Sequence, residues 1–164
     1  MKTKLLALGL ALAIASCSSA KKEEKSETEE VAETELAEQS SGISDYMSLK
    51  DALVQTDASA AKDAATKLAE SATNENWNAD IVEAAKTIAS SDDVEVQRTA
   101  FKTVTDGLIA ALKANDSEDG VYVQYCPMAF DNTGASWLSM SDQIRNPYFG
   151  DKMLKCGRVV ETSL

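Results

Sequence analysis

The segment from Ser44 to Asn115 contains no proline and a single glycine, and this lack of helix breakers constrains the fold more than any other feature. Apolar residues recur along it at spacings of three, four and seven, the period of an amphipathic α-helix. They form three stripes: Tyr46, Leu49, Leu53, Ala60, Ala64 and Leu68; Ile81, Ala85 and Ile88; and Phe101, Val104, Leu108 and Leu112. We therefore expect a mainly α fold with helices over residues 44–72, 79–90 and 93–114. These would pack as an antiparallel three-helix bundle, with a four-helix bundle as the alternative.

Two local patterns refine this bundle. Asp92 followed by Glu95 has the spacing of a capping box and predicts the start of the third helix. The first helix is rich in alanine, which lets a neighbouring helix approach closely. We favour packing within the bundle as the reason for these alanines, and docking of a partner helix is the alternative.

The sequence changes character after Asn115. Val121 to Tyr125 has the composition and alternation of a strand, so we expect an irregular C-terminal segment with one short strand. Turn-forming residues follow in three places: Asn132-Thr133-Gly134, Asn146-Pro147-Tyr148-Phe149-Gly150 and Cys156-Gly157. Both prolines lie in this segment, as do Cys126 and Cys156. Irregular segments on a rigid scaffold often carry function, so the functional residues are expected here.

The N-terminus predicts export and attachment to a membrane. Residues 1–16 combine a basic start with an apolar stretch too short to span a bilayer, as in a secretory signal peptide. Ile14-Ala15-Ser16-Cys17 resembles the lipobox of bacterial lipoproteins, which implies cleavage before Cys17 and lipidation of its sulfur. An ordinary signal peptide with an incidental cysteine is the alternative. Residues 17–42 are rich in glutamate and predict a disordered acidic stalk, which leaves residues 43–164 as the folded domain. We expect a lipid-anchored protein of the bacterial cell envelope, on the periplasmic or surface face of the outer membrane.

Composition argues against several functions. The formal net charge is −11, so the chain lacks the basic surface that a nucleic-acid partner requires. It contains no histidine, so a cysteine nucleophile would lack its usual base. No glycine-rich phosphate loop is present, and the spacing of the carboxylates singles out no acid/base pair. We therefore do not expect an enzyme.

Two cysteines and two methionines form the most informative pattern of the C-terminal segment. Cys126 and Met128 flank a proline, and Met153 and Cys156 are separated by three residues, which one helical turn places on the same face. Thiolate and thioether sulfurs select Cu(I), whereas structural zinc prefers four strong ligands. The pattern predicts a soft-metal site built from these four residues, with Met140 as an extra donor. Packing of the methionines in the core is the alternative.

A Cys126–Cys156 disulfide competes with the metal hypothesis. If Cys17 is lipidated, these two thiols have only one pairing in an oxidising compartment. Closing a loop of about thirty residues would stabilise the fold by roughly 3–4 kcal/mol in the chain-entropy model. Both hypotheses place Cys126 next to Cys156, and the two states can be redox forms of one site.

A family resemblance adds to these inferences. The segment from Ile43 to Gly157 resembles uncharacterised bacterial extracytoplasmic domains that occur alone in Bacteroidetes and attached to periplasmic adaptor subunits of copper/silver efflux systems. The motifs that carry the resemblance are CPM at 126–128, GASWLS at 134–139, NPYFG at 146–150 and MLKCG at 153–157. The tetrapeptide YCPM is also similar to a heavy-metal-binding motif of such adaptors, although Ala129 replaces the histidine of that motif and Phe130 its second proline.

The resemblance implies a protein that binds Cu(I) or Ag(I) and buffers the ion or passes it to an efflux adaptor. The alternative is a non-metal interaction module of the envelope, stabilised by a disulfide between Cys126 and Cys156.

Overall fold

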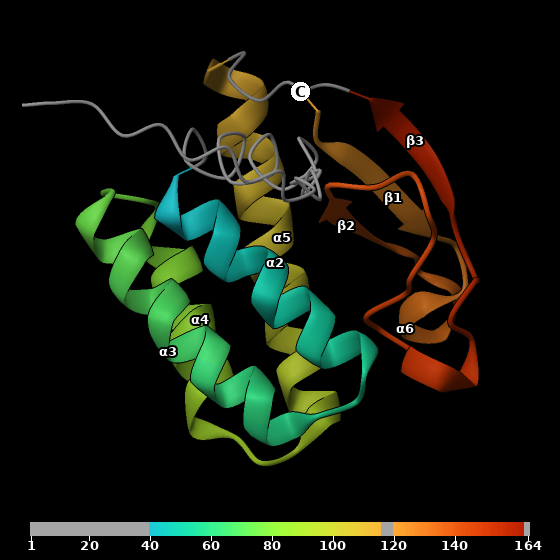
Figure 1. The fold of residues 1–164 in the computed structure, drawn as a ribbon, viewed down its shortest axis with the longest axis horizontal. Helices are drawn as coiled ribbons and strands as arrows, with labels where there is room; N and C mark the ends of the chain where they lie inside the picture. Colours follow the sequence, from blue (N-terminus) through green and yellow to red (C-terminus); the bar gives the residue numbers. More distant parts are fainter. Residues whose placement is uncertain (1–39, 116–119, 163–164) are drawn as a thin grey trace, which may run out of the picture. The chain divides into compact units, whose positions relative to one another are not determined.

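Four helices form the N-terminal part of the fold, followed by a small sheet. The computed structural model describes residues 40–115 and 120–162. Each helix packs against the next as an antiparallel bundle (Figure 1). The helices are α2 (Ser41–Val54), α3 (Ala58–Asn74), α4 (Ala79–Ser90) and α5 (Val94–Asn115). The mainly α class is confirmed, with the four-helix alternative realised.

The helix predicted over residues 44–72 is divided into α2 and α3. Thr56 adopts φ 58°, which ends α2, and the Asp57 side chain accepts a hydrogen bond from the backbone N–H of Ala60 at 2.9 Å and so caps α3. The break changes which alanine faces inward at the start of α3, while Ala64 and Leu68 further along are buried as expected. Ala61 is consequently buried, whereas Ala60, which the continuous stripe placed inward, is exposed.

The ends of two helices also differ from expectation. Ser40 caps α2, so Ser41 and Gly42 belong to the helix and not to the predicted stalk. At the start of α5 the cap is Asp93, whose carboxylate accepts from the backbone N–H of Glu95 at 2.8 Å. Asp92, the predicted cap, instead pairs with Lys62 of α3 at 2.6 Å.

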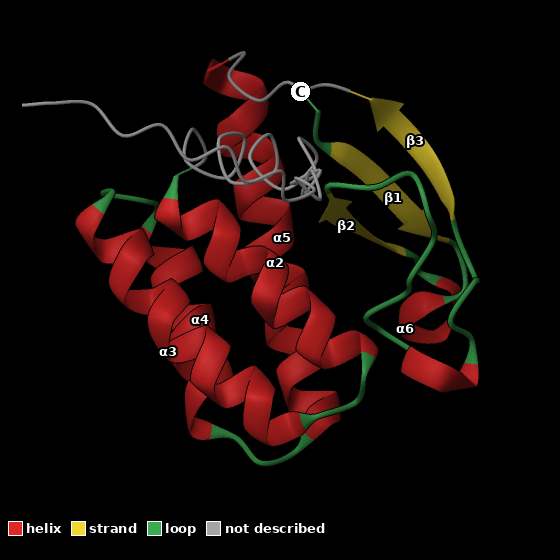
Figure 2. Ribbon diagram, viewed as in Figure 1, coloured by secondary structure: helices red, strands yellow, loops and turns green. Residues whose placement is uncertain are grey.

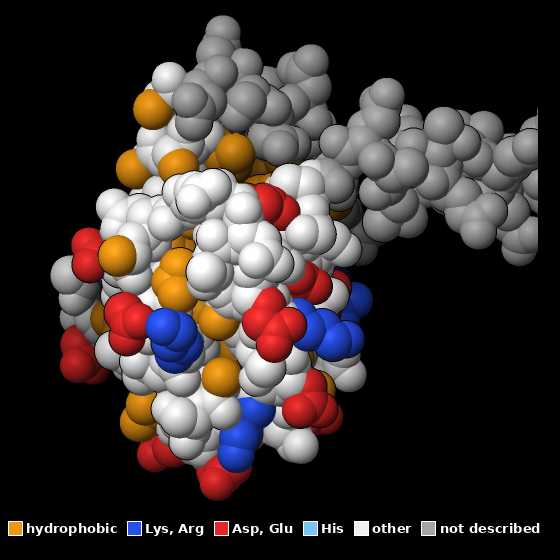
Figure 3. Space-filling model, turned by 90° about the vertical axis from the view of Figure 1, so that its left-hand side faces the viewer, with side chains coloured by type: hydrophobic (Ala, Val, Ile, Leu, Met, Phe, Trp, Pro, Cys, Tyr) orange, Lys and Arg blue, Asp and Glu red, His pale blue; other side chains and the backbone are white. Residues whose placement is uncertain are grey.

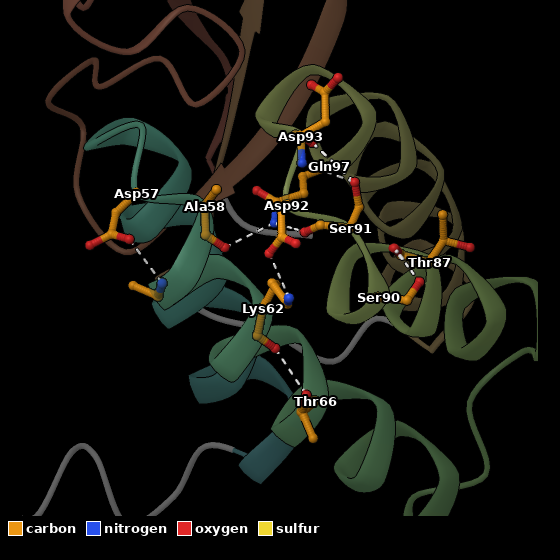
Figure 4. Close-up of polar contacts among 11 residues, drawn as sticks. Asp57, Ala58, Lys62, Thr66, Thr87, Ser90, Ser91, Asp92, Asp93 and Gln97 are labelled. Carbon is orange, nitrogen blue, oxygen red and sulfur yellow. Dashed lines mark hydrogen bonds and ion pairs between the residues drawn. The ribbon is translucent and has the colours of Figure 1, made fainter.

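A buried glutamine ties two loops of the bundle together. The Gln97 side-chain amide donates to the carbonyl of Ala58 at 2.9 Å and to that of Ser91 at 2.7 Å (Figure 4). Ala58 begins α3 and Ser91 follows α4, so this one side chain fixes the ends of both helices against α5.

The alanines of α3 pack inside the bundle. Ala61, Ala65 and Ala72 are buried, and α3 contacts both α2 and α4. Figure 3 shows the molecule from the side on which α3 and α4 lie in Figure 1, with acidic and basic side chains spread among small groups of hydrophobic ones. Packing within the chain therefore accounts for these alanines.

The C-terminal segment contains a three-stranded antiparallel sheet of order β2-β1-β3 (Figure 2). The strands are β1 (Tyr122–Cys126), β2 (Ala135–Ser139) and β3 (Arg158–Thr162). The sequence predicted the first strand alone. Between β2 and β3 lie a long loop and the short 3₁₀ helix η1 (Gly150–Lys152).

Aromatic residues join the helices to the sheet. Tyr46 of α2 stacks on Phe101 of α5 with ring centroids 5.2 Å apart, and Phe101 contacts Tyr148 at 5.8 Å. Tyr148 in turn meets Trp137 of β2 edge to face. The predicted core residues of α5 are buried: Phe101, Val104, Leu108 and Leu112. These contacts therefore fix the sheet, and the loop between β2 and β3, against the helical bundle.

The predicted signal peptide, the lipidation site Cys17 and the stalk up to residue 39 lie outside the described residues. Within the described ranges, which belong to the unit Glu38–Leu164, no helix combines the length and the apolar character needed to cross a membrane.

Candidate functional site

The fold brings the two cysteines of the C-terminal segment into contact. Cys126 ends β1 and is buried, and Cys156 is half-buried two residues before β3. Pairing of β1 with β3 sets Tyr125 opposite Arg158, and this pairing draws the two neighbouring cysteines together. Their sulfurs lie 2.8 Å apart, the adjacency that both the metal and the disulfide hypotheses require.

Asn146 organises the loop that carries Cys156. The side chain is fully buried, and its amide nitrogen donates to the carbonyl of Cys156 at 2.8 Å. Its side-chain oxygen accepts from the backbone N–H of Tyr148 at 2.8 Å, and its backbone N–H donates to the carbonyl of Leu154 at 2.8 Å. These bonds close the loop upon itself and fix the backbone at Cys156.

Arg98 of α5 fastens this loop to the helical bundle. Its guanidinium is 2% exposed and donates through Nε to the carbonyl of Pro147 at 2.9 Å. Nη2 donates to the Leu53 carbonyl and the Thr56 hydroxyl, and Nη1 pairs with Glu95 at 2.7 Å. One buried cation thus links three separate parts of the chain: the end of α2, the start of α5 and the NPYFG turn.

Gly150 allows the close approach that this arrangement needs. It has φ +55°, and a Cβ at this position would collide with the hydroxyl of Thr56 and lie 3.0 Å from the carbonyl of Val54. Only glycine satisfies both the conformation and the space at this contact.

The contact with Cys126 raises the pKa of the Cys156 thiol. The hydrogen bond with Cys126 is the largest of the influences that raise the pKa of the Cys156 thiol, followed by burial and by the charge that Cys126 would carry as a thiolate. The backbone N–H of Met128 donates to the Cys156 sulfur and opposes this rise. A ligand that binds the thiolates must therefore displace protons.

The two predicted thioether donors line a cavity beside the pair. Met128 lies two residues after Cys126, Met153 lies three residues before Cys156, and both line a cavity of about 640 Å³ that neither cysteine lines. Met128 is 48% exposed and Met153 is half-buried, so packing in the hydrophobic core does not account for Met128. Met140 lines a different cavity, at the far end of the strand pair from Cys126, so the structure does not bring it to the cysteines.

A strained turn forms part of the cavity wall. Phe130, Asp131 and Asn132 have φ values of 51°, 54° and 66°, three consecutive left-handed residues without a glycine. They lie in the short segment α6 (Ala129–Asn132). The Phe130 ring packs edge to face on Tyr148, with centroids 5.3 Å apart, and this contact helps hold the turn against its conformational cost.

The donors at this site suit a soft ion better than zinc. In the described part of the chain, no three residues among Cys, Asp, Glu and His are grouped as a metal site, so two thiols and nearby thioethers are the available set. Metal–thiolate bonds of about 2.3 Å place two ligating sulfurs roughly 3.8 Å apart in a tetrahedral site. The cysteine sulfurs must therefore separate by about 1 Å to admit an ion. Cys156 is the half-buried partner on a loop, so it is the sulfur that can move.

Two residues that organise this site were not identified from the sequence. The sequence marks Asn146 only as part of a turn and of the NPYFG motif. The Asn-Pro dipeptide was the available signal for the first, because an asparagine side chain often bonds the backbone two residues further on. No pattern marked Arg98.

The fold and the site together define a small helical bundle with an appended sheet that presents a cysteine pair. Residues 43–120 match the model of a family described as a protein of unknown function (DUF3347). The match begins at Ile43 inside α2, runs through α5 and ends before β1, and it supports an uncharacterised domain family for this part of the chain. The CPM, NPYFG and MLKCG motifs lie outside it. No curated protein matches the chain, and no solved structure matches it.

Proposed function

We propose that this protein is a lipid-anchored, extracytoplasmic binding protein for Cu(I) or Ag(I), without catalytic activity. The observation that carries the proposal is the contact of Cys126 with Cys156, 2.8 Å between sulfurs, beside a cavity lined by Met128 and Met153. Thiolates supply charge, and thioethers supply neutral soft donors, the combination that favours Cu(I) over harder ions.

The biological role that we propose is buffering of the ion or its transfer to a copper/silver efflux adaptor. The proposed anchor at Cys17 would hold the domain at the envelope membrane, on a stalk long enough for it to reach a partner. The resemblance of the C-terminal motifs to adaptor-associated domains supports this partner.

Competition against a chromophoric Cu(I) chelator tests the proposal. Reduced protein should hold about one equivalent of Cu(I), and Cys126→Ser or Cys156→Ser should each remove most of the affinity. Met128→Leu, which preserves volume, should weaken binding less. Met140→Leu is the matched control, because Met140 lines the other cavity and its replacement should change nothing. Zn(II) should bind poorly for lack of further strong ligands.

The contact between the sulfurs also favours the second candidate, a non-metal interaction module with a structural disulfide. Thiol titration of the isolated protein separates the two, because the disulfide uses the same sulfurs. If the isolated protein is fully oxidised and, after reduction, fails to hold Cu(I) against the chelator, the metal function is refuted. Cys126–Cys156 would then be a structural disulfide.

A further inference from the structure

We propose that Asn146 is a positioning residue that holds Cys156 against Cys126 and limits how far the two sulfurs separate. The inference rests on the cysteine pair of the proposed function, and it does not depend on which ion the pair binds.

The contacts of Asn146 reach the backbone that carries Cys156. Two of its hydrogen bonds reach the short stretch that leads to β3: its side-chain amide donates to the Cys156 carbonyl and its backbone N–H donates to the Leu154 carbonyl, both at 2.8 Å. Its own carbonyl accepts from the backbone N–H of Gly150 at 3.0 Å. A fully buried amide with these partners costs free energy if any bond is lost, so the loop has one favoured arrangement.

The loop around Asn146 is fixed to the same frame as Cys126. Arg98 holds the Pro147 carbonyl to α5, and the Tyr148 hydroxyl donates to the carbonyl of Ser136 at 2.6 Å. Ser136 lies on β2, which pairs with β1 in the register that sets Cys126 opposite Ala135. Through its hydrogen bond to the Cys156 carbonyl, Asn146 therefore holds Cys156 in a fixed position relative to α5 and the sheet.

The restraint falls on the sulfur that has to move. Cys126 is buried at the end of the central strand, whereas Cys156 sits in a turn closed by its backbone N–H bonding to the Met153 carbonyl at 3.0 Å. Opening the pair to roughly 3.8 Å for a tetrahedral metal shifts Cys156, and the Asn146 bond to its carbonyl resists that shift. Conversely, the same bond raises the effective concentration of one thiol at the other.

Equilibration with glutathione measures that effective concentration without any metal. One molecule of glutathione disulfide oxidises the Cys126 and Cys156 thiols to one protein disulfide and yields two molecules of glutathione. Asn146→Asp keeps the acceptor for Tyr148 but removes the amide donor to Cys156. At pH 8 it should lower the equilibrium constant at least tenfold, a shift of about 30 mV in potential.

A stability control distinguishes positioning from general loosening. Leu108→Ala weakens the helical core but should leave the glutathione equilibrium within twofold of wild type, because that equilibrium depends on the geometry of the folded site. If the equilibrium constant of folded Asn146→Asp with glutathione is also within twofold of wild type, the inference is overturned, even if Cu(I) binding is established. If wild-type protein fails to bind Cu(I), the proposed function is refuted, but the role of Asn146 measured with glutathione still stands.

If Asn146→Asp does not fold, wild-type protein provides the second measurement. The side-chain amide signals of Asn146 in a ¹H–¹⁵N spectrum should shift between the reduced and oxidised states, because the donor contacts Cys156 directly. The amide signals of Asn78, which caps α4 far along the chain, should remain in place. Unchanged Asn146 signals would overturn the inference.

Discussion

Replacement of Arg98 by methionine should destabilise the protein more than any surface substitution. Methionine preserves the apolar stem of the side chain and removes the guanidinium, which is 2% exposed. The substitution removes the donor to two buried carbonyls, those of Pro147 and Leu53, and to the hydroxyl of Thr56, an exposed residue. The Leu53 carbonyl still accepts from the backbone N–H of Thr56 at 3.1 Å, so the main loss is at the Pro147 carbonyl. It also releases Glu95, whose side chain is 65% exposed.

The expected loss follows from these two kinds of partner. A buried carbonyl left unsatisfied, as at Pro147, costs about 1–3 kcal/mol, and loss of the 3.3 Å bond to Leu53 costs less because that carbonyl keeps its backbone partner. Glu95 and Thr56 are exposed and regain water, so each contributes below about 1 kcal/mol. The total is roughly 2–4 kcal/mol. Small domains have total stabilities of about 5–15 kcal/mol, so this loss is a large fraction.

Urea denaturation followed by circular dichroism at 222 nm provides the measurement. Glu95→Gln is the matched control, since it removes the ion pair but leaves every buried acceptor bonded, and it should cost below about 1 kcal/mol. An Arg98→Met protein within about 1 kcal/mol of wild type would show that the buried bonds do not hold the loop. Equal losses in both variants would show that the ion pair, and not the buried acceptors, supplies the stability.

Three further outcomes are expected. Cys17→Ser should release the protein from the membrane fraction and abolish labelling by a fatty-acid analogue; unchanged membrane association contradicts the lipoprotein prediction. Phe101→Ala and Leu108→Ala should each lower the free energy of unfolding by about 2–5 kcal/mol, whereas Val96→Ala on the exposed face of α5 should stay within about 0.5 kcal/mol of wild type. Burial raises the pKa of Glu75, but hydrogen bonds from Ser41 and Gly42 at the start of α2 outweigh it, so the pKa lies below 4.5. Ionised Glu75 therefore stabilises the fold above that pH, and this stabilisation is lost on acidification. Glu75→Gln should therefore flatten the acid limb of stability against pH, and an identical limb in both proteins contradicts this role.

The helical half of the fold could be predicted because its information is local. The stripe from Phe101 to Leu112 follows one period and is buried as expected. The break between α2 and α3 was not predictable in the same way, because Thr56 adopts a positive φ that β-branched residues rarely adopt. Without a glycine or proline at this point, the apolar stripe continued through it and placed Ala60 inward.

The sheet and the site depend on contacts between distant parts of the chain. β3 pairs with β1 across more than thirty residues, and no local pattern in its sequence specifies that partner. The burial of Arg98 is even harder to predict from local sequence, because its acceptors at Leu53 and Pro147 lie far from it in the chain, on either side. Adjacency of Cys126 and Cys156 was predictable only because the two chemical hypotheses for the pair both required it.

The exposed Met128 side chain bears on the choice between the metal hypothesis and the structural disulfide. A structural disulfide needs only its two cysteines, and it offers no reason for the Met128 side chain to be 48% exposed on a cavity wall. Under the proposed function, Met128 and Met153 are the thioethers that an ion in this cavity would meet, and the two cysteines, which do not line the cavity, would supply the charged ligands. Cys126, buried at the end of β1, then fixes one ligand, and Cys156 supplies the ligand that adjusts. Because oxidation would consume both thiolates at once, the redox state of this one contact would decide whether the site can hold an ion.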